Sequence, residues 1–420
     1  MHMNIALVYP RPNEHKYPRF GFSYDWAVIA TALHNQNNNV FLYDFSVQYY
    51  DRVSFLDFLI SKAIQLVVIE FDSFTLKRSE NFIHGYEIID AIRSKCGKLP
   101  VIVYGHYPCI VKEPIKNADR TVNRGGLSYF SNCINEYLPP ANQIHLDSIN
   151  EYPFIDRTYI NEQIPFYAKN NKSSLIRTSL GCGNSCIFCQ RKSWCQHYTE
   201  LPDRYVYDEF QLLAAQNILN LWIVDDNFTF HLGRAKRILK GLIDRGYTKD
   251  MKISLSSWVN VDEEFLELAQ KANVKVISFG IESANYEILN FYKKNIDLQH
   301  AKDIIRHADE CGIFTIGNFI IGAPNETTDT ISKTFSFIEE CGFDQLNIKI
   351  LSYLAGAKLF DYLPESLKNS TRVFACKENG LTNFSLTELE HIKNDFIEAY
   401  RKFRYSKLQD KIKKFGTPYD

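Results

Sequence analysis

The chain has 420 residues, enough for two or three domains with sizeable cores. Its 48 Lys and Arg balance 49 Asp and Glu, so no overall positive field favours nucleic acid as a partner. No apolar run approaches the length of a membrane span and no secretory signal opens the sequence. We therefore expect a cytoplasmic protein without a membrane partner. In that compartment its ten cysteines are expected to be thiols or metal ligands, not disulfides.

The first 150 residues alternate short apolar runs with helical patterns. The runs contain few polar residues, as parallel strands covered on both faces do, so they predict a doubly wound (Rossmann-like) α/β domain over residues 1–140. Strands are expected at 5–9, 40–43, 66–70 and 101–104, and helices near 25–34, 54–62 and 82–96. Ligands in such sheets bind beyond the carboxyl ends of strands, here the loops of residues 10–23, 71–79 and 105–113.

A proline-containing polar segment, residues 141–171, is expected to be a linker to a second series of strand–helix units. The strands of that series are expected at 175–179, 221–224, 253–256, 274–279, 314–321 and 346–351. Six units are too few for a closed eight-fold barrel, so we expect a partial (β/α)6 TIM barrel over residues 172–365. Residues 366–420 read as a helical C-terminal region, and the basic cluster near its end indicates a solvated helix.

Three cysteines, Cys182, Cys186 and Cys189, directly follow the first expected barrel strand at spacings of four and three. They can converge on one small centre, and Gly181 and Gly183 let the backbone wrap tightly around it. An iron–sulfur cube usually takes four thiolates, so three leave one iron open for another ligand.

Two other interpretations of this loop remain. The thiols could be inert core cysteines, although three within eight residues of a glycine-containing loop argue against that. Alternatively, Cys195 or His197 could complete a tetrahedral zinc site. Neither alternative explains the segments that follow.

The Cys-x3-Cys-x-Phe-Cys loop resembles the signature of the radical S-adenosylmethionine (SAM) superfamily. The resemblance implies that the three cysteines hold a [4Fe–4S] cluster and that SAM chelates the fourth iron. It also implies that the reduced cluster cleaves SAM to a 5′-deoxyadenosyl radical. The electron would come from a flavodoxin-type or chemical reductant.

Further landmarks of this family follow in order over about residues 172–365. Asp226, in Val224-Asp-Asp-Asn-Phe228, matches the segment that holds the SAM amino group, and a helix N-cap acid is the alternative interpretation. Lys293 or Lys294 lies where the family often has a lysine, and a surface lysine is an equally good interpretation. The resemblance gives these candidate SAM contacts: Phe188, Asp226, Glu282, Ser283, Ile320 and Gly322.

The segment from Pro100 to Pro108 resembles part of the cobalamin-binding domain that precedes many radical SAM barrels. Its candidate cobalamin contacts are Tyr104, Gly105 and His106. Family members usually show Gly-Gly-x-His here, so Tyr104 adds bulk where a cobalamin tail would pass. They also show an acidic turn where this chain has Asn123-Arg-Gly-Gly126.

Several reactions are compatible with these resemblances. The first is cobalamin-dependent methyl transfer to an unactivated carbon of a small molecule. The second is a cobalamin-independent dehydration, epimerisation or dehydrogenation of a sugar-like natural-product intermediate, as in the diol dehydratase of the apramycin pathway. A non-enzymatic cobalamin or metal sensor is a third. Methylthiotransfer is disfavoured because Cys96, Cys109 and Cys133 are not placed to converge. The catalytic residue stays unknown, with Cys195 as a weak candidate.

Overall fold

The computed structural model describes residues 2–10, 22–71, 83–124, 126–169, 172–193, 195 and 197–418. It divides into two compact units, Met1–Ser174 with Arg191–Gln196, and Leu175–Gln190 with His197–Asp420. The expected fold class is confirmed: a doubly wound N-terminal region, a barrel-like parallel sheet and a helical C-terminal segment. The four-part division into domains and a linker stays a prediction.

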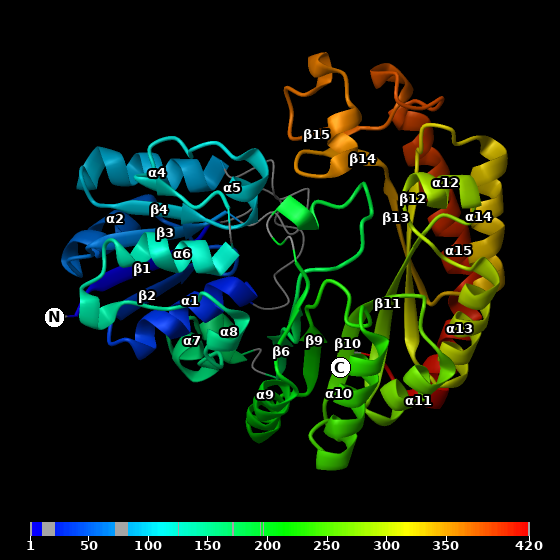
Figure 1. Ribbon diagram of the computed structural model, residues 1–420, viewed down its shortest axis with the longest axis horizontal. Helices are drawn as coiled ribbons and strands as arrows, with labels where there is room; N and C mark the ends of the chain where they lie inside the picture. Colours follow the sequence, from blue (N-terminus) through cyan, green and yellow to red (C-terminus); the bar gives the residue numbers. More distant parts are fainter. Residues whose placement is uncertain are drawn as a thin grey trace. The chain divides into compact units, whose positions relative to one another are not determined.

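The first unit contains a parallel sheet in the order β2-β1-β3-β4-β5. Helices α2 and α4 cover one face of the sheet and α1 and α6 the other (Figure 1). The strand order reverses between β1 and β3, so this is the switch point at which doubly wound sheets bind ligands. The bounds are β1 Asn4–Tyr9, α1 Tyr24–Asn35, β2 Asn39–Asp44, α2 Arg52–Ser61, β3 Leu66–Glu70, α4 Ile83–Cys96, β4 Val101–Tyr104, α5 His106–Val111, β5 Arg120–Thr121 and α6 Gly126–Asn135.

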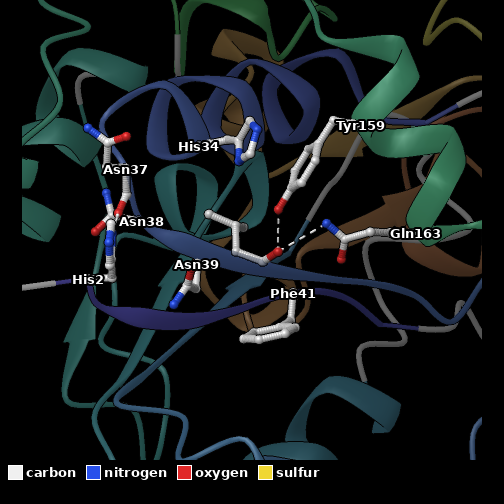
Figure 2. Close-up of a pocket in the computed structure, with 9 residues that line it drawn as sticks. His2, His34, Asn37, Asn38, Asn39, Phe41, Tyr159 and Gln163 are labelled. Carbon is white, nitrogen blue, oxygen red and sulfur yellow. Dashed lines mark hydrogen bonds between the residues drawn. The ribbon is translucent and has the colours of Figure 1, made fainter.

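The segment expected as a linker holds η1 (Pro140–Asn142), η2 (Ile149–Glu151), α7 (Arg157–Gln163) and α8 (Pro165–Lys169). It forms part of the first unit. The side-chain amide of Gln163 accepts from Leu42 N at 2.9 Å and donates to Val40 O at 3.0 Å. The Tyr159 hydroxyl donates to the same carbonyl (Figure 2). Helix α7 thus satisfies backbone groups of the edge strand β2 that another chain could otherwise pair with.

The second unit is built on a six-stranded sheet in the order β13-β12-β11-β10-β9-β6. Strands and helices alternate along the chain, and neighbouring strands from β9 to β13 pair in parallel. A sheet of six strands agrees with the expected partial barrel. The bounds are β6 Ser173–Ile176, α9 Asp203–Ala215, β9 Asn220–Ile223, α10 Leu232–Arg245, β10 Lys252–Trp258, α11 Glu263–Lys271, β11 Val274–Glu282, α12 Tyr286–Phe291, α13 Leu298–Glu310, β12 Phe314–Ile321, α14 Thr328–Cys341 and β13 Gln345–Ile350.

Beyond β13, a short hairpin and a long helix complete the second unit. The hairpin pairs β14 (Ser352–Leu354) with β15 (Arg372–Phe374). The 3-10 turns η4 (Lys358–Tyr362) and η5 (Glu365–Leu367) lie in the connection between these strands, and η6 (Lys377–Asn379) follows β15. Helix α15 runs from Leu386 to Phe415. None of the described helices is long and apolar enough to cross a membrane.

The C-terminal basic cluster was expected on a solvated helix, and that expectation is wrong for two of its residues. Lys411 donates to Asp309, to Asp344 and to the carbonyl of Ile313, at 2.7–2.8 Å. Arg404 donates to Asp344 Oδ1 at 3.1 Å. Both side chains are buried, because α15 packs along β13 and needs paired charges at that contact.

Candidate functional site

The cysteine loop begins at the carboxyl end of β6. The short strand β7 (Ser179–Leu180) pairs with β8 (Thr199–Glu200), so the segment between these two strands begins and ends side by side. All three cysteines of the loop are half-buried. Gly181 has φ +78°, which side chains rarely adopt. A Cβ on Gly183 would lie 2.0 Å from the Phe230 ring, so glycine is required at both positions.

Asp225 anchors the base of this loop. Its carboxylate accepts from Thr178 N at 2.6 Å, from Thr178 Oγ1 at 2.5 Å and from Ser179 Oγ at 2.6 Å. Arg234 donates to Thr178 O at 2.7 Å and to Leu201 O at 3.1 Å. Asp225 is fully buried and Asp226 is half-buried. The predicted SAM contact is therefore the acid of the pair that stays accessible.

The middle of the loop is tied to elements far along the chain. Ile187 N donates to Tyr292 O at 3.2 Å, just after α12, and Leu359 N donates to Ile187 O at 2.8 Å. Phe188 packs edge-on against Tyr292, with ring centroids 5.2 Å apart. Ile187, Tyr292 and Ile320 belong to one buried apolar cluster, against which Phe188 packs. Two of the candidate SAM contacts, Phe188 and Ile320, are thus brought together.

Burial raises the pKa of the Cys186 thiol to about 12, and the Lys294 ammonium opposes this shift. Iron binding requires the thiolate, so assembly of a cluster here must displace a proton. Asn184 Nδ2 lies 3.5 Å from Cys182 Sγ. In the described part of the chain, no three or more His, Cys, Asp or Glu side chains converge as a site for one metal ion. The three thiols of the loop are therefore not gathered around one point, but in number and type they match the donor set of a cluster with one open iron.

Glu282 and Ser283 follow each other at the end of β11, and both are buried. Glu282 has φ +73° and pairs with Lys294, whose Nζ lies 2.7 Å from its Oε1. Lys294 is buried and Lys293 is exposed, so the interpretation as a surface lysine is wrong for Lys294. The Ser283 hydroxyl accepts from Asn285 N at 3.1 Å, which holds the turn into α12.

The turn after β12 carries the last pair of candidate SAM contacts. Gly322 has φ +93°, where a side chain would be strained. Glu326 folds back, accepting from Gly322 N and, at 3.1 Å, from Ala323 N. Burial raises the pKa of Glu326 to about 7, although both backbone bonds lower it. Glu326 therefore fixes the backbone that presents Ile320.

Three buried residues and one half-buried residue contribute to this site without having been named as site residues from the sequence: Asp225, Asn227 and Glu326, and Trp258. Asn227 Oδ1 accepts from Thr229 Oγ1 at 3.1 Å and from Trp258 N at 3.2 Å, linking β9 to the end of β10. All four residues lie at or shortly after the carboxyl end of a strand, where the sites of such barrels gather, so their positions in the sequence could have indicated them.

Cys195, the weak catalytic candidate, lies just after η3 (Arg191–Ser193), and its N–H donates to Arg191 O at 3.0 Å. This segment belongs to the first compact unit, in which η3 packs on α5. Cys195 is half-buried, and its catalytic role stays a prediction.

The candidate cobalamin contacts lie together at the carboxyl end of β4. Gly105 has φ +121°, and a Cβ there would lie 2.3 Å from Phe71 O. His106 begins α5, and its Nε2 lies 3.8 Å from Asp25 Oδ2. Of the three loops expected to receive a ligand, residues 11–21 and 72–79 lie outside the described residues.

Tyr104 fills part of this edge. Its hydroxyl donates to Glu70 Oε2 at 3.0 Å, and Ser23 Oγ donates to Glu70 Oε1 at 2.6 Å. Its ring lies 4.9 Å from that of Phe130. Tyr104 and Glu70 are each 3% exposed. The strand order and Gly105 fit a ligand-binding edge, but the hydrogen-bonded Tyr104, Glu70 and Ser23 side chains do not fit a cobalamin tail at this edge unless they move apart.

A surface hollow of about 520 Å³ lies at the opposite, amino edge of the same sheet (Figure 2). His34 stacks on Tyr159 at 3.9 Å, and His2 contacts Asn37 O at 2.6 Å. Because parallel sheets bind ligands at the carboxyl edge, this hollow is not the candidate site.

Comparison with known proteins agrees with this geometry. Residues 176–338 match the family model described as the radical SAM superfamily. They form a radical SAM domain. The match begins at the last residue of β6, includes all three loop cysteines and the strands from β9 to β12, and ends within α14; this fold implies a [4Fe–4S] cluster and SAM.

Similar sequences include an uncharacterised methyltransferase of Pyrococcus horikoshii, 30% identical over 56% of this chain and 51% of its own length. Another is the cytidylyl-2-hydroxyethylphosphonate methyltransferase of Streptomyces wedmorensis, 26% identical over 46% of this chain and 38% of its own. This chain therefore spans about half or less of the length of these two relatives.

Among solved structures, the radical SAM methyltransferase TsrM from Kitasatospora setae, solved with cobalamin and a [4Fe–4S] cluster, has a TM-score of 0.66. That likeness covers 84% of this chain and 76% of TsrM at 19% identity. OxsB, a cobalamin-dependent radical enzyme solved with aqua-cobalamin and SAM, has a TM-score of 0.64 at 16% identity and covers 86% of this chain and 55% of OxsB. At these identities the likeness establishes the fold.

Proposed function

We propose that this chain is a radical SAM enzyme that acts on a small molecule and transfers a methyl group in a cobalamin-dependent reaction. The observation that carries the proposal is the arrangement at one sheet edge. A three-cysteine loop, the accessible Asp226 and the Ile320–Gly322 turn all follow carboxyl ends of strands in a single parallel sheet. Methyltransferases among the similar proteins support the reaction class.

In this proposal Cys182, Cys186 and Cys189 hold the cluster, and a bound, reduced cluster with SAM supplies a carbon-centred radical. The chain's own residues bind and orient SAM. The Asp226 carboxylate pairs with the SAM ammonium. Phe188 and Ile320 give the adenine an apolar surface that excludes water, and the φ of Gly322 lets the backbone approach closely.

The test begins with protein purified and reconstituted without oxygen, then offered SAM and dithionite. We expect 5′-deoxyadenosine above the amount made by the Cys186→Ala variant. No product above that control would refute radical SAM activity and leave a metal or cobalamin sensor. Retained hydroxocobalamin is then quantified after desalting, and about one per chain is expected.

A second candidate is a cobalamin-independent dehydration, epimerisation or dehydrogenation, which the buried Tyr104–Glu70 bond favours. The Tyr104→Gly variant discriminates between the two. If the wild type retains no cobalamin but still forms 5′-deoxyadenosine, and Tyr104→Gly gains cobalamin binding, methyl transfer fails and the second candidate stands. Equal retention by both proteins would mean that Tyr104 does not obstruct the cofactor.

A further inference from the structure

The barrel sheet has one face that its helices do not cover. Along β10 the side chains alternate between buried and half-buried, with Ile253 and Leu255 on the buried side and Ser254 and Ser256 on the other. Helix α11 packs on β11 and α13 on β12, and α13 and α14 run along one side of the sheet (Figure 1). Parallel strands covered on both faces are apolar throughout. Serines at alternate positions therefore mark a face that is not packed core.

One row of residues, which we call the polar row, crosses this face from strand to strand. Trp258 of β10 is in register with Gly280 of β11, and Gly280 with Asn318 of β12. Asn318 is in turn in register with Asn347 of β13. All four residues are half-buried. Bulky branched side chains fill the interior of a closed barrel, whereas this row contains a glycine and two amides. The polar row thus offers hydrogen-bonding groups where a packed barrel offers none.

Hydrogen bonds hold the two amides of the polar row in one orientation. Asn347 Nδ2 donates to Asn318 Oδ1 at 2.9 Å. Asn318 Nδ2 donates to Ser278 Oγ at 2.8 Å and to Phe279 O at 2.9 Å. Within the described residues, Asn347 Oδ1 and the Ser256 hydroxyl have no hydrogen bond, and the Ser278 hydroxyl accepts one without donating. Half-buried polar groups without partners are costly, so ligand groups that bond to them gain affinity.

Charge is unevenly distributed on this face. A Cβ on Gly280 would lie 2.9 Å from both Glu282 Oε1 and Lys294 Nζ, so this ion pair lies over the polar row. Its two charges lie 2.7 Å apart and compensate each other. Lys349 follows Asn347 by two residues in β13 and so lies on the same side of that strand. It is exposed, and no carboxylate of the described residues pairs with it. Its ammonium is therefore available to an anion.

We propose that this face binds the substrate, and that the substrate is a small acid that carries hydroxyl or amide groups. The inference rests on the proposed function and names the substrate class of the same site. The uncharged polar groups complete the hydrogen bonds left open at Ser256, Ser278 and Asn347. The anionic group pairs with the Lys349 ammonium. The Trp258 ring ends the polar row at β10 and gives the substrate an apolar surface.

The test measures how three probes that share one hydroxylated ring bind to reconstituted protein in the presence of SAM. Glucuronate carries a carboxylate, glucose is uncharged and glucosamine carries an ammonium, and saturation-transfer nuclear magnetic resonance gives each Kd. We expect glucuronate to bind at least roughly threefold tighter than glucose, and glucosamine to bind most weakly, because Lys349 attracts an anion and repels a cation. Lys349→Gln should remove this order and leave the three affinities similar.

Two further variants test the hydrogen-bonding groups. Asn318→Leu removes the centre of the polar row and should weaken glucuronate and glucose alike, by roughly fivefold or more. Asn394→Leu makes the same change at an exposed position of α15 and is the matched control. Ser256→Val breaks no hydrogen bond made by the described side chains, so it serves if Asn318→Leu does not fold. It should weaken the same two probes.

The outcomes separate the substrate class from the proposed function. Wild-type protein that binds none of the three probes overturns the inference, as does glucuronate that binds no tighter than glucosamine. Wild-type affinities in Ser256→Val, or the wild-type order of probes in Lys349→Gln, overturn it too. Formation of 5′-deoxyadenosine is measured on the same preparations. Its absence refutes the proposed function, whereas its presence with any of these binding results refutes the substrate class alone.

Discussion

The adjacent acids Asp225 and Asp226 provide the sharpest test of how the site is built. Asp225 accepts hydrogen bonds from Thr178 N, Thr178 Oγ1 and Ser179 Oγ in a fully buried setting. Hydrogen bonds to a charged group each contribute about 1.5–3 kcal/mol. In Asp225→Asn the hydroxyls can turn to accept from the new amide, so we expect a loss of about 2–4 kcal/mol in the free energy of unfolding.

Asp226→Asn is the matched control. It makes the same chemical change one residue away, on a half-buried side chain. We expect a change of unfolding free energy within about 1 kcal/mol, as for most accessible positions. SAM affinity should instead weaken by about 1.5–3 kcal/mol, roughly 10- to 150-fold, through loss of a charge-assisted bond.

Urea unfolding of the cluster-free proteins measures the first effect, and equilibrium dialysis of SAM against reconstituted protein measures the second. Equal destabilisation by the two variants would contradict the assignment of Asp225 as the anchor of the loop. Unchanged SAM affinity in Asp226→Asn would contradict its assignment as the ligand contact.

Three further predictions concern the loop and the turn after β12. Cys186→Ala should abolish SAM cleavage and lower iron content while circular dichroism stays near wild type; a full cluster spectrum with turnover would show that the ligands are misassigned. Gly183→Ala should reduce cluster incorporation, because its Cβ would meet the Phe230 ring at 2.0 Å, and Gly183→Ala/Phe230→Leu should recover part of it; no recovery would count against this clash. Burial raises the pKa of Glu326 from 4.5 to about 7. Between these pH values the folded state therefore binds more protons than the unfolded state. The free energy of unfolding should fall by up to roughly 3 kcal/mol as pH rises through that window. Glu326→Gln should lack this slope in urea unfolding at pH 5 to 8, and parallel curves for the two proteins would refute it.

The strands of both sheets were largely predictable because each is a short apolar run between helical patterns. β3, β4 and β12 begin and end as predicted. β10 and β11 extend further, to Trp258 and Glu282, because their last residues pair with neighbouring strands in spite of being polar or bulky. Helices α7 and α8 were missed, because prolines and polar residues there resemble a linker when packing against β2 is not known.

The sequence by itself determined where chemistry could occur, because cysteine spacing and strand ends are local properties. It placed Cys182, Cys186 and Cys189 in one loop and Asp226 beyond the next barrel strand. Only the tertiary structure decided which neighbours serve that chemistry. Asp225 is buried beneath the loop, Lys294 pairs with Glu282, and Tyr104 bonds to Glu70. Those partners are set by strand register and by burial, and both arise only when segments distant in the chain pack together.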